Sequence, residues 1–241
     1  MPSEGKGPDG GEVRATVLRF TRRQRIEHHI MALLFIVLVV TGLPQKFFDA
    51  SWAGPAVRLL GGLDLMRWLH RMAGFAFAGF TGYFLAYVTA GILRGGTPLS
   101  IVPFLSDLRE VYHALLWAAG LGERPAAGRF DYREKIEFWG MLLGSGVMIV
   151  TGLILYFPIV ATRWLPGEVV PAAKTAHSYE AMLALMVIVF WHLYNAMLRP
   201  GVFPLDTTIV HGRMALERLK EEHPLEYARL FPGEAGEREE K

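Results

Sequence analysis

Four of the eight histidines lie near the ends of long apolar segments. In a membrane protein, an imidazole at such a position can bind a metal within the bilayer. His28 opens the first such segment, His70 the second and His177 the fourth, and His192 lies near the far end of the fourth. Ionisable side chains within membrane segments are costly and usually functional. Neutral imidazole is also the commonest metal ligand in proteins. The type and positions of these four residues therefore predict metal chemistry.

Depth sorts the four histidines into two pairs. His28 and His192 share one membrane level, and His70 and His177 share the opposite level. His177 and His192 are 15 residues apart, which in a helix is a rise of roughly 22 Å and a return to within about 60° of the same face. Because a six-coordinate haem takes two axial ligands, this spacing predicts two stacked haems, each with one ligand from the fourth segment.

The other four histidines are expected not to bind iron. His29 points about 100° away from His28 on a helix, so only one of the two can ligate. His113 belongs to a predicted surface helix, and His211 and His223 belong to the polar C-terminal region. The alternative for the first four is that lipid headgroups satisfy them at the interface. The matching of four histidines by depth argues against that alternative.

The elements that position these residues are membrane-spanning helices. The chain has 241 residues, of which 52% are hydrophobic, and its mean hydropathy is +0.27. A span needs about 20 apolar residues, and helices satisfy their own backbone in lipid. We expect an all-α membrane protein, a four-transmembrane-helix bundle with short interfacial helices within residues 49–68 and 102–119. The four segments cover approximately residues 28–48, 69–93, 138–160 and 177–198.

The predicted bundle occupies residues 19–225, between a polar N-terminal tail (1–18) and a polar acidic C-terminal tail (226–241). Most of the 25 lysines and arginines lie in the N-terminal segment, the loop between the second and third spans, and the C-terminal region. The positive-inside rule then predicts that both termini are cytoplasmic, which puts His28 and His192 at the inner level. No cleavable signal peptide is expected.

The chain has no cysteine. This excludes disulfides, thiolate-held iron–sulfur clusters and the covalent attachment of c-type haem. No nucleotide-binding motif is present either, so chemistry on a distant substrate is expected to belong to another polypeptide.

Two of the predicted spans are related in sequence. Residues 25–43 (RIEHHIMALLFIVLVVTGL) and 135–153 (KIEFWGMLLGSGVMIVTGL) are identical at nine of nineteen positions. This similarity predicts a duplicated helical hairpin. The duplication maps His28 onto Phe138 and His192 onto Leu85, neither of which can bind iron. The predicted number of haems is therefore two rather than three.

Several motifs resemble the bacterial di-haem cytochrome b family, which includes gamma subunits of membrane formate dehydrogenases and cytochrome b subunits of nickel–iron hydrogenases. Arg-x-x-His precedes an apolar run that ends in Thr-Gly-Leu-Pro. Further matching segments are Leu69-His70-Arg71 and residues 132–139, 177–195 and 200–206. The resemblance implies two haem b, with His28 and His192 as the inner axial pair and His70 and His177 as the outer pair. Position 29, where the family often has Trp, is His here. The choice between His28 and His29 stays open, although the register to Thr41-Gly42 favours His28.

The resemblance also implies a quinone site near the inner haem and a redox partner subunit. Candidate quinone-site residues at the inner end of the third span are Tyr132, Glu134, Lys135 and Glu137. Candidate partners for haem propionates are Arg25, Arg71 and Lys174, because charge-assisted hydrogen bonds to carboxylates favour such side chains. The alternative for both groups is an ordinary interfacial role.

Together these features predict a subunit that transfers electrons between a partner redox subunit and the quinone pool (menaquinone or ubiquinone) in the bacterial inner membrane. The partner is a molybdenum enzyme, a hydrogenase, an iron–sulfur subunit or a multihaem cytochrome c, and no nucleic acid is expected to bind. One alternative is a haem-less or vestigial anchor subunit. Another is a four-helix carrier, which should place acidic residues or broken helices at mid-membrane, and the sequence indicates neither.

Overall fold

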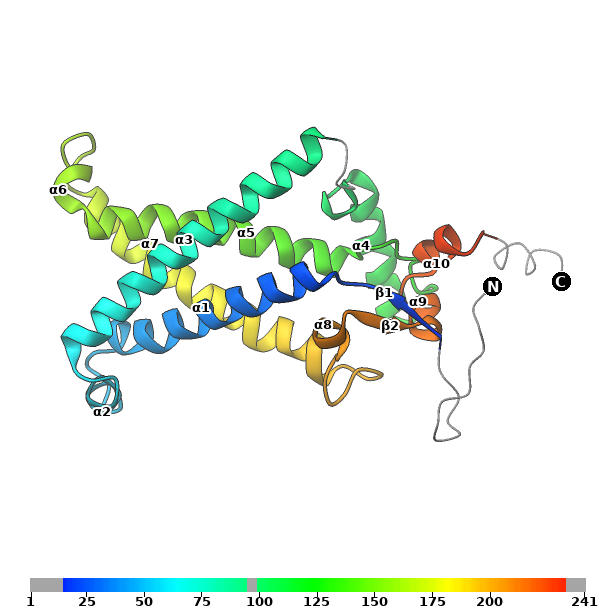
Figure 1. Cartoon of the computed structure of the whole chain (residues 1–241), viewed down its shortest axis with the longest axis horizontal. Helices are drawn as coiled ribbons and strands as arrows, with labels where there is room; N and C mark the ends of the chain where they lie inside the picture. Colours follow the sequence, from blue (N-terminus) through cyan, green and yellow to red (C-terminus); the bar gives the residue numbers. More distant parts are fainter. Residues whose placement is uncertain (1–14, 95–98, 233–241) are drawn as a thin grey trace. The chain divides into compact units, whose positions relative to one another are not determined.

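A computed structural model describes residues 15–94 and 99–232, and it contains four long membrane-spanning helices (Figure 1). Each is long and apolar enough to cross a bilayer. The prediction of an all-α, four-transmembrane-helix fold is confirmed. The spans are α1 (Arg22–Lys46), α3 (Leu63–Leu93), α5 (Tyr132–Tyr156) and Val169–Leu198, which begins as α7 (Val169–Met186).

The chain divides into two compact units. One comprises residues 26–97 and 139–206, which we call the bundle unit. The other comprises residues 1–25, 98–138 and 207–241, which we call the cap unit. Residues 1–14 and 233–241, which hold most of the two predicted polar tails, lie outside the described residues.

The four helices begin six to eight residues before the predicted apolar segments. Polar residues such as those at 22–25 and 132–135 continue the helix, whereas hydropathy detects only its apolar part. The ligand candidates therefore lie one to two turns inside their helices rather than at the first residue. The earlier start of α7 also places Glu180 eleven residues after the start of the fourth span rather than three, and its carboxylate lies against Gly144 of α5.

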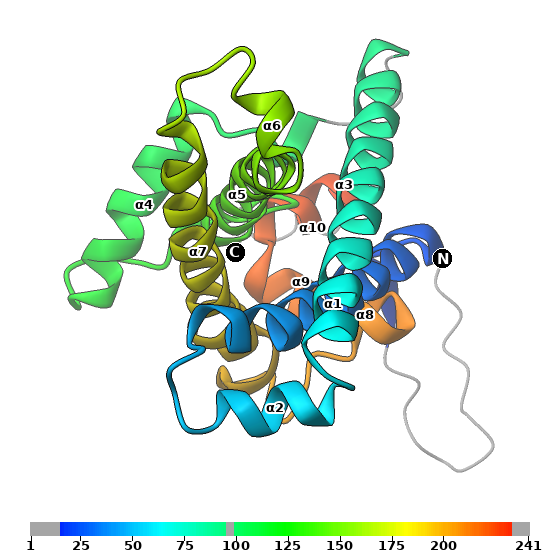
Figure 2. The same ribbon diagram turned by 90° about the vertical axis from the view of Figure 1, so that its left-hand side faces the viewer.

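Side-chain contacts join the helices of the bundle unit in pairs. Tyr83 of α3 donates a hydrogen bond to Glu27 of α1 over 3.3 Å. The ammonium of Lys46 on α1 lies 4.4 Å from the centre of the Tyr179 ring on α7. Large apolar side chains elsewhere on the four helices face outward, as lipid-facing helices require. Figure 2 views the unit from the end that carries α2 (Ala53–Leu59) and α6 (Pro158–Ala161).

The connection between the first two spans is only partly the interfacial helix that the sequence predicts. Helix α2 ends at Leu59, and the predicted continuation through residues 63–68 belongs to α3 instead. Gly61 and Gly62 separate the two helices with φ values of +82° and +98°. Glycine adopts such angles without the steric cost that other residues incur, so this pair breaks the helix.

The fourth span departs from α-helical geometry in its second half. Two π-helical segments follow α7, namely η2 (Val187–His192) and η3 (Tyr194–Leu198). Arg199 then adopts an extended conformation (φ −62°, ψ 136°), as expected for a residue that precedes proline. His192 is the last residue of η2, and π-helical turns are frequent at functional sites.

A two-stranded antiparallel sheet ties the N-terminal segment to the C-terminal segment in the cap unit. Strand β1 (Thr16–Leu18) pairs with β2 (Arg213–Ala215). Buried Met214 of β2 packs in one cluster with buried Leu219 and Tyr227. The last residues of the predicted N-terminal tail and the first residues of the predicted C-terminal tail therefore belong to folded elements. The remaining elements of this unit are η1 (Leu99–Ile101), α4 (Leu105–Ala118), α8 (Thr208–His211), α9 (Leu216–Glu222) and α10 (Pro224–Leu230).

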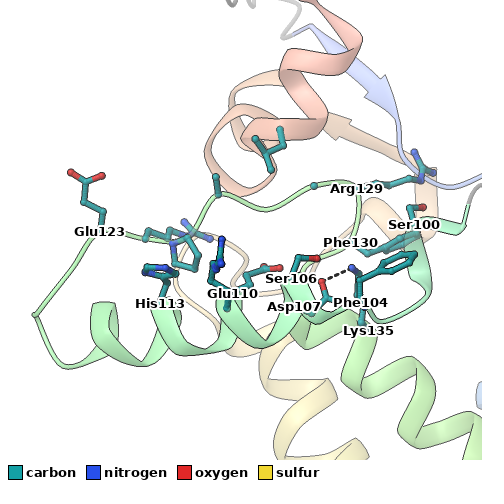
Figure 3. A pocket seen from close by; sticks show the side chains of 16 residues that line it. Ser100, Phe104, Ser106, Asp107, Glu110, His113, Glu123, Arg129, Phe130 and Lys135 are labelled. Carbon is teal, nitrogen blue, oxygen red and sulfur yellow. Dashed lines mark hydrogen bonds and ion pairs between the residues drawn. The ribbon is translucent and has the colours of Figure 1, made fainter.

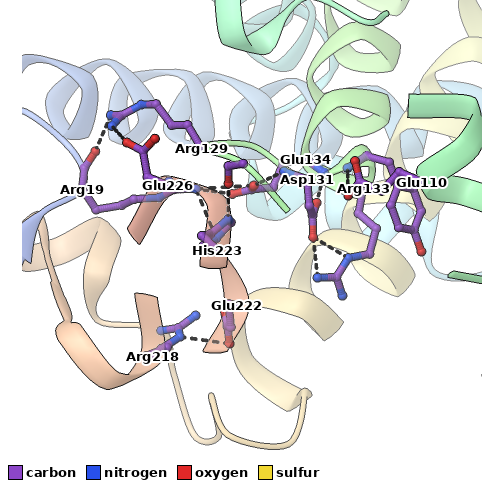
Figure 4. A network of polar contacts seen from close by, with 12 residues as sticks. Arg19, Glu110, Arg129, Asp131, Arg133, Glu134, Arg218, Glu222, His223 and Glu226 are labelled. Carbon is purple, nitrogen blue, oxygen red and sulfur yellow. Dashed lines mark hydrogen bonds and ion pairs between the residues drawn. The ribbon is translucent and has the colours of Figure 1, made fainter. Parts of the chain in front are cut away.

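The cap unit contains a partly buried polar network (Figure 4). The Arg19 side chain is 2% exposed, and its guanidinium lies 3.0 Å from the Glu134 carboxylate and 3.4 Å from Nε2 of His223. Arg129 donates to the backbone carbonyl of Arg19 over 3.0 Å and pairs with Glu226 at 3.3 Å. Burial alone would raise the pKa of Glu226. The combined effect of the Arg229 and Arg129 guanidinium groups is larger, so the pKa of this carboxyl lies below its usual value.

His223 is neutral in this network. Its Nδ1 donates to the carbonyl of Gly128 over 2.8 Å, so Nε2 accepts from Arg19. Burial, followed by the nearby charge of Arg19, lowers the pKa of His223 to about 4. Asp131 and Glu222 oppose this shift only in part.

The cap unit should therefore lose stability as the pH falls. The folded-state pKa of His223 lies below the ordinary value of 6.5, so between about pH 6.5 and pH 4 the unfolded chain binds the proton and the folded chain does not. Stability is full above this window and falls through it, by at most about 3 kcal/mol. Thermal unfolding of wild type and His223→Asn, followed by circular dichroism from about pH 7 to pH 5, measures this loss. Parallel losses in the two proteins would contradict it.

Candidate metal centres

The structure brings the four predicted histidine ligands together as two facing pairs in the bundle unit. The rings of His28 on α1 and His192 on η2 have centroids 6.0 Å apart and planes inclined by 32°. The rings of His70 on α3 and His177 on α7 have centroids 6.4 Å apart and planes inclined by 75°. Each pair joins residues far apart in the sequence and takes one member from the fourth span.

The spacing within each pair fits an iron held between two imidazoles. A metal–imidazole bond is about 2.0 Å long and the nitrogen lies about 1.1 Å from the ring centroid, so two axial imidazoles on one iron have centroids about 6.2 Å apart. The two observed separations lie on either side of this value. Among the described residues, no group of three or more His, Asp or Glu forms a metal site. Two imidazoles per site suit a macrocycle that supplies the other four donors itself.

Of the two adjacent histidines, it is His28 whose ring faces His192. The His29 ring stands edge-on to that of His28, with centroids 5.5 Å apart and planes inclined by 79°. This geometry favours His28 as the ligand, in agreement with the register argument from the sequence.

His70 and His177 are each contacted by a threonine that the sequence interpretation did not assign. Thr41 Oγ1 lies 2.9 Å from Nδ1 of His70, and Thr151 Oγ1 lies 2.9 Å from Nδ1 of His177. The available signal was the Thr-Gly-Leu motif that ends both repeats, which served only as a mark of duplication.

The glycine after each threonine permits close approach of the same ring. A Cβ at Gly42 would lie 3.2 Å from Cε1 of His70, and a Cβ at Gly152 would lie 3.3 Å from Cε1 of His177. Thus the two repeats present the same Thr-Gly surface to the two members of one pair. This correspondence supports the predicted duplication.

The three candidate propionate partners have different surroundings. Arg25 donates a hydrogen bond to the carbonyl of Val210 in the cap unit. The guanidinium of Arg71 lies 5.6 Å from the centre of the Tyr156 ring. Lys174 is exposed on α7. A propionate role for these three residues stays a prediction.

Two of the four candidate quinone residues already form ion pairs in the cap unit. Glu134 pairs with Arg19, and Lys135 pairs with Asp107 at 2.7 Å. The backbone N–H of Tyr132 donates to Glu110 over 3.3 Å. Burial raises the pKa of Glu110.

Lys135 also lines a cavity of about 590 Å³ in the cap unit (Figure 3). Its walls carry both acidic and basic side chains, so their charge favours no single sign of ligand. The charged lining residues are Asp107, Arg109, Glu110, Glu123, Arg124, Arg129 and Lys135.

Four apolar spans with paired, facing histidines define a membrane cytochrome of the b type. The chain matches the sequence profile of the prokaryotic cytochrome b561 family over residues 19–204, and it belongs to that family. It is therefore a multi-pass prokaryotic membrane protein that carries b-type haem and transfers electrons.

Similar proteins agree with this assignment. The formate dehydrogenase cytochrome b556(fdo) subunit of Escherichia coli (strain K12) is 27% identical over 218 residues, covering 89% of this chain and 93% of the relative. The formate dehydrogenase cytochrome b556 subunit of Haemophilus influenzae is 24% identical over 219 residues, covering 88% and 82%. The nitrate-inducible formate dehydrogenase cytochrome b556(Fdn) subunit of E. coli (strain K12) is 23% identical over 217 residues, covering 89% and 91%. The predicted family resemblance is confirmed.

Proposed function

We propose that this chain is a di-haem cytochrome b subunit that carries electrons between a partner redox enzyme and the quinone pool. His28 and His192 hold one haem, and His70 and His177 hold the other. The observation that carries this proposal is the pair of ring separations, 6.0 Å and 6.4 Å. When bound, each haem supplies a reversible one-electron couple. The residues of this chain fix its position and the donor atoms on its iron.

The proposed partner is an enzyme of the formate dehydrogenase type. The names of the similar proteins describe subunits of formate dehydrogenases, which favours this partner over a hydrogenase. The cysteine-free chain has no thiolate ligands for an iron–sulfur cluster of its own, so we propose that the partner enzyme supplies the redox centres that exchange electrons with these haems.

We propose further that both termini are cytoplasmic and that His28 and His192 form the inner pair. Two arguments support this orientation. Most of the lysines and arginines lie in the segments assigned to the inner side. Strand β1, before the first span, pairs with β2, after the fourth, as expected when both ends lie on one side.

Quinone exchange is proposed at the inner level. Tyr132, Glu134, Lys135 and Glu137 at the start of α5 are the candidate contacts. The ion pairs of Glu134 and Lys135 give these two residues structural roles as well. Replacing Tyr132 by phenylalanine tests for a hydroxyl contact without breaking either ion pair.

The purified protein is expected to contain two haem b per chain. A pyridine haemochrome assay gives this ratio, and a reduced-minus-oxidised spectrum should show the alpha bands of b haem. A quinol analogue should then reduce the haems. Absence of the alpha bands would leave the haem-less anchor as the better proposal. Three haems per chain would contradict the assignment of Phe138 and Leu85 as positions without ligands.

A further inference from the structure

Thr41 and Thr151 make the same three hydrogen-bond contacts at equivalent positions of the two repeats, and the longest are 3.4 Å to the carbonyl of Leu38 and 3.3 Å to that of Met148. Both side chains are buried, with 2% and 8% of their surface exposed. Thr41 Oγ1 lies 2.6 Å from the carbonyl of Val37, and Thr151 Oγ1 lies 2.6 Å from the carbonyl of Val147. Each hydroxyl also lies 2.9 Å from Nδ1 of an outer histidine.

These contacts fix the position of every proton involved. A threonine hydroxyl has one hydrogen, and a carbonyl oxygen can only accept, so each hydroxyl donates to the carbonyl four residues before it. The hydroxyl oxygen must then accept from the histidine. Nδ1 of His70 and Nδ1 of His177 therefore carry hydrogens, and Nε2 of each ring has the lone pair needed to bind a metal.

The threonine hydroxyls also hold the orientation of the His70 and His177 rings. Because Gly42 and Gly152 have no side chain, the rings approach α1 and α5 closely enough for these hydrogen bonds. Partners that accept the second N–H of a ligating histidine raise the basicity of the ligand and hold its ring. A more basic ligand stabilises oxidised iron more than reduced iron.

We propose that Thr41 and Thr151 are positioning residues that fix the donor tautomer of His70 and His177 and lower the reduction potential of the outer haem. This inference rests on the proposed haem ligation. One threonine serves each axial ligand of the same haem, one from each repeat. Loss of both should therefore shift the potential more than loss of either.

The test is an optical redox titration of the purified protein with both haems bound. Thr41→Val and Thr151→Val remove the hydroxyls with little change of volume, and Thr41→Ser and Thr151→Ser restore them. We expect each valine variant to move the outer haem to a more positive potential, with a larger shift in the double variant. The serine variants should return the potential toward wild type. The potential of the inner haem should not change.

Haem retention gives a second readout. Loss of such a partner typically weakens metal binding by about 10–100-fold, so the outer haem should dissociate faster from the valine variants and not from the serine variants. The low-spin ferric EPR signal of the outer haem should also change, because it depends on the angle between the two imidazole planes, 75° here.

Thr81→Val is the matched control. Thr81 is a buried threonine of α3, 5% exposed, whose hydroxyl has no hydrogen-bond partner among the described residues. Its replacement should leave both potentials unchanged. An outer potential that is unchanged in the double valine variant, or that shifts equally in Thr81→Val, would overturn the inference. Those results would leave haem ligation intact, whereas a wild-type protein without two haems would overturn the proposed function itself.

Discussion

Replacing His192 by alanine is expected to remove the inner haem and to stop quinol-linked electron transfer. Only the ring of His28 would then remain at this site, since the pair consists of these two imidazoles. An axial ligand bonds the iron directly, so its loss should exceed the about 10–100-fold effect of losing an outer-shell partner. The haem-to-protein ratio should fall from two to one. Quinol-dependent reduction of the remaining haem should fall at least about 100-fold.

Two matched replacements on α1 accompany this variant. His28→Ala removes the facing ring and should reproduce the loss of the inner haem. His29→Ala removes the neighbouring ring, which stands edge-on to His28, and should keep both haems. Loss of the inner haem from His29→Ala, with retention in His28→Ala, would show that the ligand had been assigned to the wrong histidine.

The four spans and the depths of the histidines in the membrane could be predicted from the sequence for physical reasons. An apolar run of sufficient length has few stable states other than a membrane helix. The rise per residue then fixes the depth of each histidine, as it did for His177 and His192. The first residues of the helices could be predicted less accurately, because residues such as Arg22 and Tyr132 extend the helices beyond the apolar runs.

The contacts of Thr41 and Thr151 with the histidines could be predicted only in part from the sequence. The repeated Thr-Gly-Leu motif marks equivalent positions in two helices, but a motif does not say which ring a hydroxyl meets. The separations in sequence between the bonded residues are 29 and 26, so the two repeats differ in the length of the connection. Only the packed helices bring each threonine to its histidine.

Two other features left no usable sequence signal. The π-helical segments after Met186 are composed of the same apolar residues as an ordinary span. The network around Arg19 joins residues that are 115 and 204 positions apart in the chain. His223 was assigned to the polar C-terminal region, whereas it is a buried member of this network, 4% exposed.

The complementary variant, His70→Ala, should leave only the inner haem, so that reduction of this haem can be measured in the absence of the outer haem. This replacement leaves His177 without its facing ring and leaves Thr41 without its imidazole partner. The outer haem should be lost and the inner haem retained, because the proposed ligands of the inner haem, His28 and His192, are not changed by this replacement.

If quinone reacts at the inner level and the partner enzyme at the outer level, quinol should still reduce the single haem of His70→Ala at close to the wild-type extent. Electrons from the partner's substrate should no longer reach that haem. Stopped-flow absorbance in the alpha band measures both reactions in one preparation, and His211→Ala, outside the spans on α8, should leave both unchanged. Reduction of the retained haem by the partner's substrate but not by quinol would reverse the proposed wiring, because it would place the quinone at the pair formed by His70 and His177.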